Sequence, residues 1–222
     1  EPVTVDRAAL RQFIGLQYVP PPRTGFTEIT GVPQGHRGFA DGKGVQAESY
    51  HDWKDIPVRA SGDASRDIVS LLDDAVKVRL QADVPVGGFL SGGVDSAAVV
   101  ALAAKHLDRS LRTFTMGFPN IGMDERAEAR EIAKAFHTDH LEFEAKPEDL
   151  ARVAEYVINQ YDAPFADSSS LPLMLLSEEA SREIKVVLTG DGGDETFGGY
   201  RRYVAFDRAL RYVTSPQVAE QA

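Results

Sequence analysis

Apolar residues recur every three or four positions in one stretch of the chain, and this spacing predicts an amphipathic helix. The stretch begins behind Asp63, a residue type that caps helices well. Its apolar positions are Ile68, Leu71, Leu72, Ala75, Val76 and Leu80. The next segment, 84–90, is a short apolar run with a proline near its start, where a strand tolerates one. We therefore expect the first core strand there.

The rest of the chain repeats this rhythm of strand and helix. The expected helices are 96–106, 124–136, 147–160, 171–182 and one that starts at Gly199, and the expected strands are 112–118, 140–144 and 185–189. Strands that alternate with helices favour right-handed crossover connections and a parallel sheet with helices on both faces. The predicted fold class is α/β, with a mainly parallel, doubly wound sheet.

The first sixty residues have a different character. Three consecutive prolines at 20–22 fix φ and predict a stiff, extended connector at 19–23. Farther on, the Asp-Gly pair in 41–44 supplies the positive φ of a tight turn, which predicts a hairpin. The expected organisation is therefore an N-terminal connector at residues 1–60 and a main domain at residues 61–222.

Composition narrows the class of protein. With 43% apolar and 26% charged residues in 222, the chain is an ordinary folded globule. Its longest apolar run, 97–104, is much shorter than the roughly 18 residues that a membrane span requires. The net charge of −10 opposes binding along nucleic acids or anionic lipid, so small-molecule partners are favoured.

The absence of cysteine excludes disulfides, thiolate metal sites and a cysteine nucleophile. It also fits a reducing compartment, and we expect a cytoplasmic protein. Because the chain starts with Glu1 and has no basic and apolar leader, we expect a processed chain or an excised fragment.

The most informative stretch is the glycine-rich turn Ser-Gly-Gly-Val-Asp-Ser that begins at Ser91, between an apolar strand and a helix of small residues. Open parallel sheets bind ligands at such turns. Gly92 and Gly93 let bare N–H groups approach an anion, and the following helix presents more of them. The hydroxyls of Ser91 and Ser96 add donors. Asp95 would repel a phosphate unless a cation lay between them, so the turn predicts a phosphate site with Mg²⁺.

This turn has a plainer interpretation, in which Asp95 and Ser96 merely cap the helix. It is not a Walker loop, because no Gly-Lys-Ser or Gly-Lys-Thr follows the glycines. It also lacks the G-x-G-x-x-G pattern of dinucleotide-binding turns.

A second turn, at 189–200, follows another apolar strand and strengthens the functional interpretation. It contains three carboxylates and five glycines. Such acidity has no packing rationale, and so many glycines suggest that the backbone must pass close to something. With Asp95 opposite, Asp194 could complete a metal site shared with phosphates. The alternative is a solvated acidic turn.

Three other features have weaker implications. His137 and His140 have the spacing H-x-x-H but no third ligand, so we interpret them as structural. The mixed charge run at 125–131 is typical of a solvated helix face with i,i+4 pairing. Arg201 and Arg202 stand close to the acidic turn, where they could neutralise it or contact substrate.

The two turns together resemble the synthetase domain of class B asparagine synthetases, which are PP-loop ATP pyrophosphatases. The motif S-G-G-V-D-S marks the PP-loop superfamily, and G-D-G-G-D-E with F-G-G-Y narrows the resemblance to the asparagine synthetases within it. The resemblance covers essentially the whole chain to Tyr203. The segments that resemble the connector after the family's glutaminase domain, or the part before its acidic turn, are 10–13, 18–24, 32–36, 162–169 and 171–172.

The resemblance implies a reaction with ATP and Mg²⁺. The side-chain carboxylate of aspartate attacks the α-phosphorus, pyrophosphate leaves, and ammonia from glutamine displaces AMP from the acyl-adenylate. Asp95 and Asp194 would bind the metal. Asp191 stands where some relatives carry a Glu tied to formation of the adenylate, so the candidate catalytic residues are Asp191, Asp95 and Asp194. The resemblance assigns pyrophosphate to Ser91, Gly92, Gly93, Asp95 and Ser96, and the nucleotide's adenine to Leu90, Met116, Thr189 and Gly190.

The chain also departs from the family. The glutaminase half, which begins with a catalytic Cys, has no counterpart here, so we expect a glutaminase domain in cis or in trans. We also expect a C-terminal truncation, because the chain stops at Ala222, before the region where relatives supply a Lys for pyrophosphate.

Several alternatives stay open. Relatives of this architecture amidate other carboxylates or close lactam rings. A further interpretation is that the chain is a nucleotide-binding domain without catalytic turnover. A PP-loop enzyme that acts on tRNA is disfavoured by the charge of −10 and the lack of Cys. The sequence leaves the oligomeric state open.

Overall fold

The computed structural model describes residues 2–58, 62–118, 124–161 and 164–213. They form two compact units, the first made of Glu1–Ala64 and Lys146–Leu175, the second of Ser65–Ala145 and Leu176–Ala222. Both glycine-rich turns belong to the second unit. The boundary expected at residue 60 falls outside the described residues, and the division into 1–60 and 61–222 stays a prediction.

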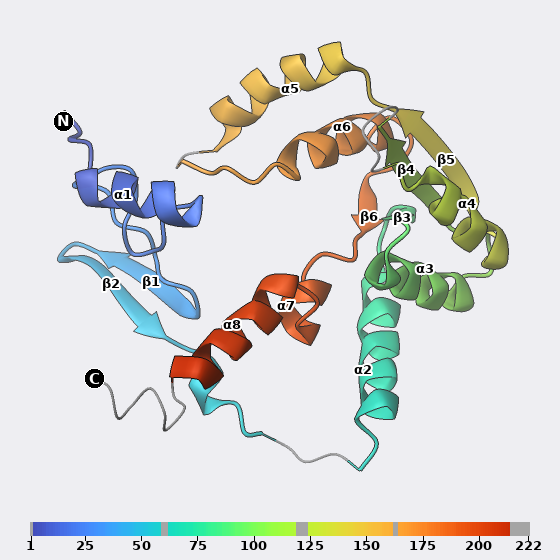
Figure 1. Cartoon of the computed structure of the whole chain (residues 1–222), viewed down its shortest axis with the longest axis horizontal. Coiled ribbons are helices and arrows are strands. Elements are labelled where there is room, and N and C mark those ends of the chain that lie inside the picture. The colour runs from blue at the N-terminus through green and yellow to red at the C-terminus, as the bar shows by residue number, and fades with distance from the viewer. Residues whose placement is uncertain (1, 59–61, 119–123, 162–163, 214–222) are drawn as a thin grey trace. The chain divides into compact units, whose positions relative to one another are not determined.

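A parallel sheet forms the centre of the second unit (Figure 1). Its strands are β3 (Val86–Phe89), β4 (Arg112–Gly117), β5 (Asp139–Glu144) and β6 (Val186–Leu188), in the spatial order β5-β4-β3-β6. Strand β3 lies between β4 and β6, and its Gly87 pairs with Arg112 on one side and Val187 on the other. The predicted α/β fold with a mainly parallel sheet is confirmed.

The helices around this sheet lie where the hydrophobic pattern predicts them. They are α2 (Ala64–Arg79), α3 (Val94–His106), α4 (Arg126–Ala135) and α6 (Ser170–Ala180). The bounds of α3, α4 and α6 differ from the predicted ones by at most two residues. No helix in the described ranges is long and apolar enough to cross a bilayer.

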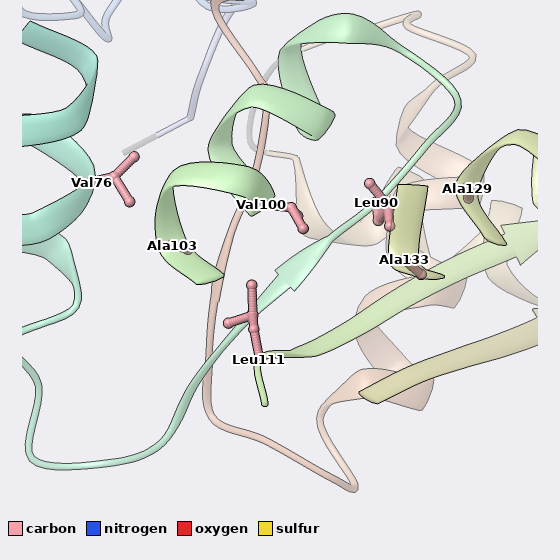
Figure 2. Packing of buried hydrophobic residues seen from close by; sticks show 7 residues of the cluster. All are labelled: Val76, Leu90, Val100, Ala103, Leu111, Ala129 and Ala133. Carbon is pink, nitrogen blue, oxygen red and sulfur yellow. The ribbon is translucent and has the colours of Figure 1, made fainter. Parts of the chain in front are cut away.

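Two hydrophobic clusters cover the two faces of the sheet. The first contains Val76, Leu90, Val100, Ala103, Leu111, Ala129 and Ala133, which come from α2, α3, α4 and the strand ends (Figure 2). The second is built on Phe114, with Phe89 and Ala180 packed against it. Phe89 and Leu90 are consecutive in an extended segment, so their side chains point to opposite faces. The expected helices on both faces are therefore present.

The first unit contains helix α1 (Arg7–Leu16), helix α5 (Pro147–Gln160), the strands β1 (His36–Asp41) and β2 (Gly44–Ser49), and the short 3₁₀ helix η1 (Trp53–Asp55). Strands β1 and β2 are antiparallel, and the pairing of Asp41 with Gly44 confirms the predicted hairpin. The positive φ of its turn lies at Gly44, at 131°, and not at the Asp-Gly pair as predicted.

Two features of this unit differ from the sequence-based expectation. A turn at Pro21 and Pro22 interrupts the connector, so the expected stiff extension over 19–23 was wrong there. The Gly31 N–H donates to the Pro22 carbonyl at 2.9 Å. Helix α1 was not predicted. It is capped by Asp6, whose carboxylate accepts from the N–H groups of Ala8 and Ala9 at 2.8 and 3.2 Å.

Candidate functional site

The first glycine-rich turn joins β3 to α3 at the carboxyl end of an inner strand of the sheet. Leu90, which is 2% exposed, extends the strand, since its N–H donates to the Phe114 carbonyl at 2.9 Å. The Thr115 hydroxyl donates to the Leu90 carbonyl. The turn therefore leaves from a buried strand end that is held on both backbone groups.

The start of α3 bears on the interpretation in which Asp95 and Ser96 merely cap this helix. The N-cap position is occupied by Gly93, and no side chain caps the helix there. Asp95 lies inside the first turn of the helix, and Ser96 is buried one residue later. Neither residue is the N-cap, so capping does not explain why this turn contains an Asp followed by a Ser.

The two serine hydroxyls brace the turn from within. The Ser91 and Ser96 hydroxyl oxygens lie 2.9 Å apart, and the Ser91 N–H donates to the Ser96 oxygen at 3.1 Å. The Gly93 N–H donates to the Ser91 hydroxyl oxygen at 3.1 Å. Both hydroxyls thus have partners inside the turn, and their predicted contact with pyrophosphate stays a prediction.

The second turn leaves β6, the neighbour of β3, at the same edge of the sheet. It continues into the short helix α7 (Gly193–Phe197) and then into α8 (Arg201–Val213). Helix α7 was not predicted. Gly192 and Gly198 flank it with φ of 89° and 71°, a left-handed conformation that side-chain-bearing residues adopt at a cost.

The two turns meet at Asp95. A Cβ atom on Gly190 would lie 2.6 Å from the Ser96 backbone nitrogen, and one on Gly193 would clash with the Asp95 carboxyl group. Real Cβ atoms do not approach other heavy atoms so closely, so only glycine lets the second turn pass here. This is the close approach that the glycine content predicted.

The acidic residues of the second turn are placed differently from one another. Asp194 follows Gly193 directly, and its carboxyl group lies against Gly199, whose N–H donates to the Asp194 carbonyl at 3.0 Å. Asp191 lies in the turn itself, with its N–H directed at the Thr189 hydroxyl oxygen at 3.4 Å. Asp191 and Asp194 thus each follow a glycine that lies against Asp95, namely Gly190 and Gly193.

Glu195, in the middle of α7, is engaged by a residue that follows this helix. The Tyr200 hydroxyl donates to its carboxylate at 2.7 Å, which lowers the pKa of Glu195 and raises the pKa of Tyr200 to about 12. The Arg202 guanidinium stacks over the Tyr200 ring at 4.1 Å from its centre. Arg202 thus contacts the acidic turn through Tyr200, and its predicted roles of neutralising that turn or contacting substrate stay predictions.

The residues expected to contact adenine share one edge of the sheet. Leu90, Met116 and Thr189 stand at or just after the carboxyl ends of β3, β4 and β6, which are adjacent strands (Figure 1). Parallel strands place such residues side by side where ligands bind in open α/β sheets. Gly190 follows Thr189 and touches Ser96.

The side chains that the structure describes limit the kind of metal site that the two turns could form. Within the part of the chain that the structure describes, no three His, Asp or Glu residues are grouped closely enough to hold a metal ion. This excludes, for those residues, a site of the zinc type with three or four protein ligands. Magnesium is instead usually held by one or two carboxylates together with waters and the ligand's phosphates. The expected pair of Asp95 and Asp194 would supply carboxylates of this kind, and it stays a prediction.

The His140 side chain is 8% exposed, its Nδ1 lies 2.9 Å from the Thr113 hydroxyl oxygen, and burial lowers its pKa. These contacts fit the structural interpretation of His140, and that of His137 stays a prediction. A cavity of about 480 Å³ lies beside His137 and His140, and none of the predicted site residues lines it.

Sequence reasoning missed two glutamates at the start of α4. The Gly92 N–H donates to the Glu125 carboxylate at 3.1 Å, and a Cβ on Gly92 would lie 2.8 Å from the Glu128 Cβ. Both glutamates therefore adjoin the first turn. No periodicity in the sequence indicates this contact, because it depends on how α4 is placed against the end of β3.

The same segment was misread as a helix face with i,i+4 pairs. Arg126 instead pairs with Glu144 at 3.0 Å, and Arg130 pairs with Glu142 at 2.7 Å. Both partners belong to β5. The interpretation was wrong for these arginines, because the strand beside α4 offers them carboxylates.

Comparison with known proteins gives a consistent result. Residues 67–221 match the family model described as asparagine synthase. Asparagine synthetase 1 (glutamine-hydrolyzing) of Bacillus subtilis is 33% identical over 203 residues, 90% of this chain and 32% of that protein. A putative asparagine synthetase of Mycobacterium tuberculosis is 36% identical over 205 residues, 90% of this chain and 31% of that protein.

The chain thus spans about a third of the length of these curated relatives. Asparagine synthetase B of Escherichia coli is 31% identical over 78% of this chain and 34% of its own length. Among solved structures, the NH3-dependent NAD synthetase of Campylobacter jejuni aligns with a TM-score of 0.41 at 18% identity, over 61% of this chain and 60% of that one.

Proposed function

The chain belongs to the asparagine synthase family, and on that premise we propose that it contains the ATP-dependent, amide-forming ligase domain of a synthetase of this family. The proposed reaction activates a carboxylate, by default that of aspartate, as an acyl-adenylate, and ammonia then forms the amide. The observation that carries the proposal is the passage of Gly190 and Gly193 against Asp95. It joins the two motifs into one centre.

In this proposal the first turn binds the phosphates that leave as pyrophosphate. Gly92 and Gly93 offer backbone N–H groups, and α3 directs its positive dipole end toward the same place. Ser91 and Ser96 hold the turn's shape through their paired hydroxyls. Such donors act on the charge that develops on the leaving group, and because they are already ordered they cost little reorganisation.

The carboxylates of Asp95 and Asp194 would hold Mg²⁺ together with the phosphates. Bound there, the metal would neutralise charge on the triphosphate and stabilise the departing pyrophosphate. Without a cation, Asp95 would repel the phosphates that the neighbouring N–H groups attract. This conflict of charges within one turn supports a metal-dependent site.

The remaining site residues have positioning roles in the proposal. Leu90, Met116, Thr189 and Gly190 would contact adenine mainly through their backbones at the sheet edge. Asp191 would act near the reacting carboxylate, where it could influence formation of the adenylate.

The partners follow from the same reaction. The relatives are named glutamine-hydrolyzing enzymes, and we propose that ammonia reaches this domain from a glutaminase domain, in cis or in trans. We further propose a cytoplasmic location, where ATP and amino acids are available.

Exchange of labelled pyrophosphate into ATP tests the proposal, because it requires reversible adenylate formation but no ammonia. We expect exchange that depends on both Mg²⁺ and aspartate, and expect Asp194→Asn to abolish it. Exchange that depends on a different carboxylate would show that aspartate is not the substrate, and it would leave the proposed ligase function standing. Nucleotide binding without exchange under any carboxylate would contradict the ligase function and favour a nucleotide-binding domain without turnover.

A further inference from the structure

One backbone N–H of the first turn already has an anionic partner within the chain. The Gly92 N–H donates to Glu125 Oε2 at 3.1 Å. The neighbouring amides have neutral acceptors, since the Ser91 N–H donates to the Ser96 hydroxyl and the Gly93 N–H to the Ser91 hydroxyl. Among the backbone N–H groups described for residues 91–93, the one of Gly92 is thus the donor to a carboxylate.

The start of α4 is held at this place by Arg126. Its guanidinium donates to Asp124 through Nε at 2.9 Å and to Glu144 through Nη1 at 3.0 Å. It also packs so tightly on Gly117, the last residue of β4, that a Cβ there would overlap it. These contacts anchor the α4 start to the carboxyl ends of β4 and β5.

The backbone of α4 also approaches Gly92 itself. An added Cβ on Gly92 would lie 2.8 Å from the Glu128 Cβ and 3.5 Å from the Glu125 Cβ. The position of Glu125 beside the turn is therefore imposed by packing. Its side chain, in contrast, is exposed and can leave the turn by rotation about its own bonds, without any movement of the backbone.

We propose that the Glu125 carboxylate is an exchangeable occupant of the phosphate turn. It accepts from the Gly92 N–H when no phosphate is bound, and a phosphate oxygen of the ligand replaces it. This inference rests on the proposed function, because it takes the turn to be the phosphate site. A carboxylate that must be displaced, and that repels the incoming anion, weakens phosphate binding and favours release of pyrophosphate.

Glu125 therefore lowers the affinity of the site for phosphate. Its removal should strengthen phosphate binding, whereas removal of a ligand-binding residue would weaken it. If Glu125 instead helped Asp95 and Asp194 to hold a cation, its removal would weaken phosphate binding. The direction of the effect separates the two roles.

Titration calorimetry with inorganic pyrophosphate and Mg²⁺ measures that direction. We expect Glu125→Gln to bind pyrophosphate about five- to tenfold more tightly than the unaltered chain, which is the scale of the net free energy of one hydrogen bond. Glu125→Ala should also bind more tightly. The matched control is Glu131→Gln, which removes the same charge from α4 at a residue that pairs with Lys134 at 2.8 Å. The control should change the affinity by less than about twofold.

The Gly92 amide gives a second measurement that needs no phosphate. In an amide NMR spectrum of the chain alone, Glu125→Ala should move the Gly92 proton upfield, as expected on loss of a carboxylate acceptor, whereas Glu131→Gln should leave it in place. Pyrophosphate should then move the Gly92 resonance in the unaltered chain.

The outcomes separate this inference from the proposed function. Unchanged or weaker pyrophosphate binding in Glu125→Gln, while the unaltered chain binds, overturns the role of Glu125 and leaves the phosphate site standing. Binding by none of the variants overturns both. A Gly92 resonance that is unaffected by Glu125→Ala shows that the carboxylate is not its partner, whatever the chain binds.

Discussion

The carboxyl group of Asp95 lies against the backbone of Gly193, so closely that a Cβ atom added to that glycine would overlap it. The two residues are 98 positions apart in the sequence, 95 and 193. They meet because β3 and β6 are adjacent parallel strands, with Val86 paired to Val186, and each strand carries one of the turns at its carboxyl end.

Gly193→Ala should separate these two turns without unfolding the protein. The added methyl group would overlap the Asp95 carboxyl, which must then rotate away or push α7 aside. We expect Mg²⁺-dependent ATP binding to weaken by about tenfold or more, equivalent to about 1.4 kcal/mol. Equilibrium dialysis with labelled ATP measures this loss. The control is Gly15→Ala, where the added Cβ has no neighbour within 4 Å and helix α1 should be slightly stabilised. Equal ATP affinity in both variants would contradict the proposed convergence of the site.

Asp95→Ala should abolish Mg²⁺-dependent ATP binding and leave the circular dichroism spectrum unchanged. The carboxylate is placed to hold the cation, and loss of one partner of a charge pair costs about 3 kcal/mol, roughly a hundredfold in affinity. Asp74→Asn, on an exposed position of α2, removes the same charge away from the turns. ATP affinity measured with and without Mg²⁺ checks this. An Asp95→Ala protein with unaltered affinity would remove Asp95 from the site.

Phe114→Ala should be strongly destabilising. Phe114 is fully buried on β4, and Ala180 and Ile184 pack around it. Truncation of a buried Phe leaves a cavity and costs about 3–5 kcal/mol of the free energy of unfolding. Urea denaturation followed by circular dichroism measures the loss. Ile14→Ala, at a side chain that is 82% exposed, should change the stability by less than about 0.5 kcal/mol. Comparable losses in both variants would contradict the assigned core.

The pair formed by Tyr200 and Glu195 predicts a pH dependence at high pH. The pKa of Tyr200 is raised from 10.0 to about 12, chiefly by its hydrogen bond to Glu195. A raised pKa means that the folded state favours the protonated phenol. The stability that this group contributes is therefore fully present below pH 10 and is lost as the pH rises toward 12.

Removal of the carboxylate tests this directly. In Glu195→Gln the Tyr200 phenol should ionise closer to its ordinary pKa of 10.0. Ultraviolet absorbance of phenolate, with Tyr200→Phe subtracted to isolate this one tyrosine, measures the shift. A Tyr200 pKa that is the same with Glu and with Gln at position 195 would show that the hydrogen bond does not form in solution.

The sequence predicted the local elements that have a strong pattern. The three-to-four spacing around Val76 predicted α2, and the turn residues at 41–44 predicted the hairpin, although the positive φ of that turn lies at Gly44 and not at the Asp-Gly pair. Elements with weak patterns were missed. Helix α7 is five residues long and lies among glycines, which individually disfavour helix, so no local pattern predicts it. Helix α1 had a readable signal in its Asp6 cap, which was overlooked beside the prolines that follow.

For the site, the residue types along the chain were sufficient to name the chemistry. A glycine-rich turn with Asp95 and a second turn rich in acid and glycine predict phosphates and a divalent cation, because each residue type has a definite charge and backbone freedom. Tertiary structure alone decided that Gly193 would lie against Asp95 and that Glu125 would hold the Gly92 amide. Both contacts depend on which strands are neighbours and where α4 is anchored. Those placements result from packing between distant parts of the chain, which no local pattern specifies.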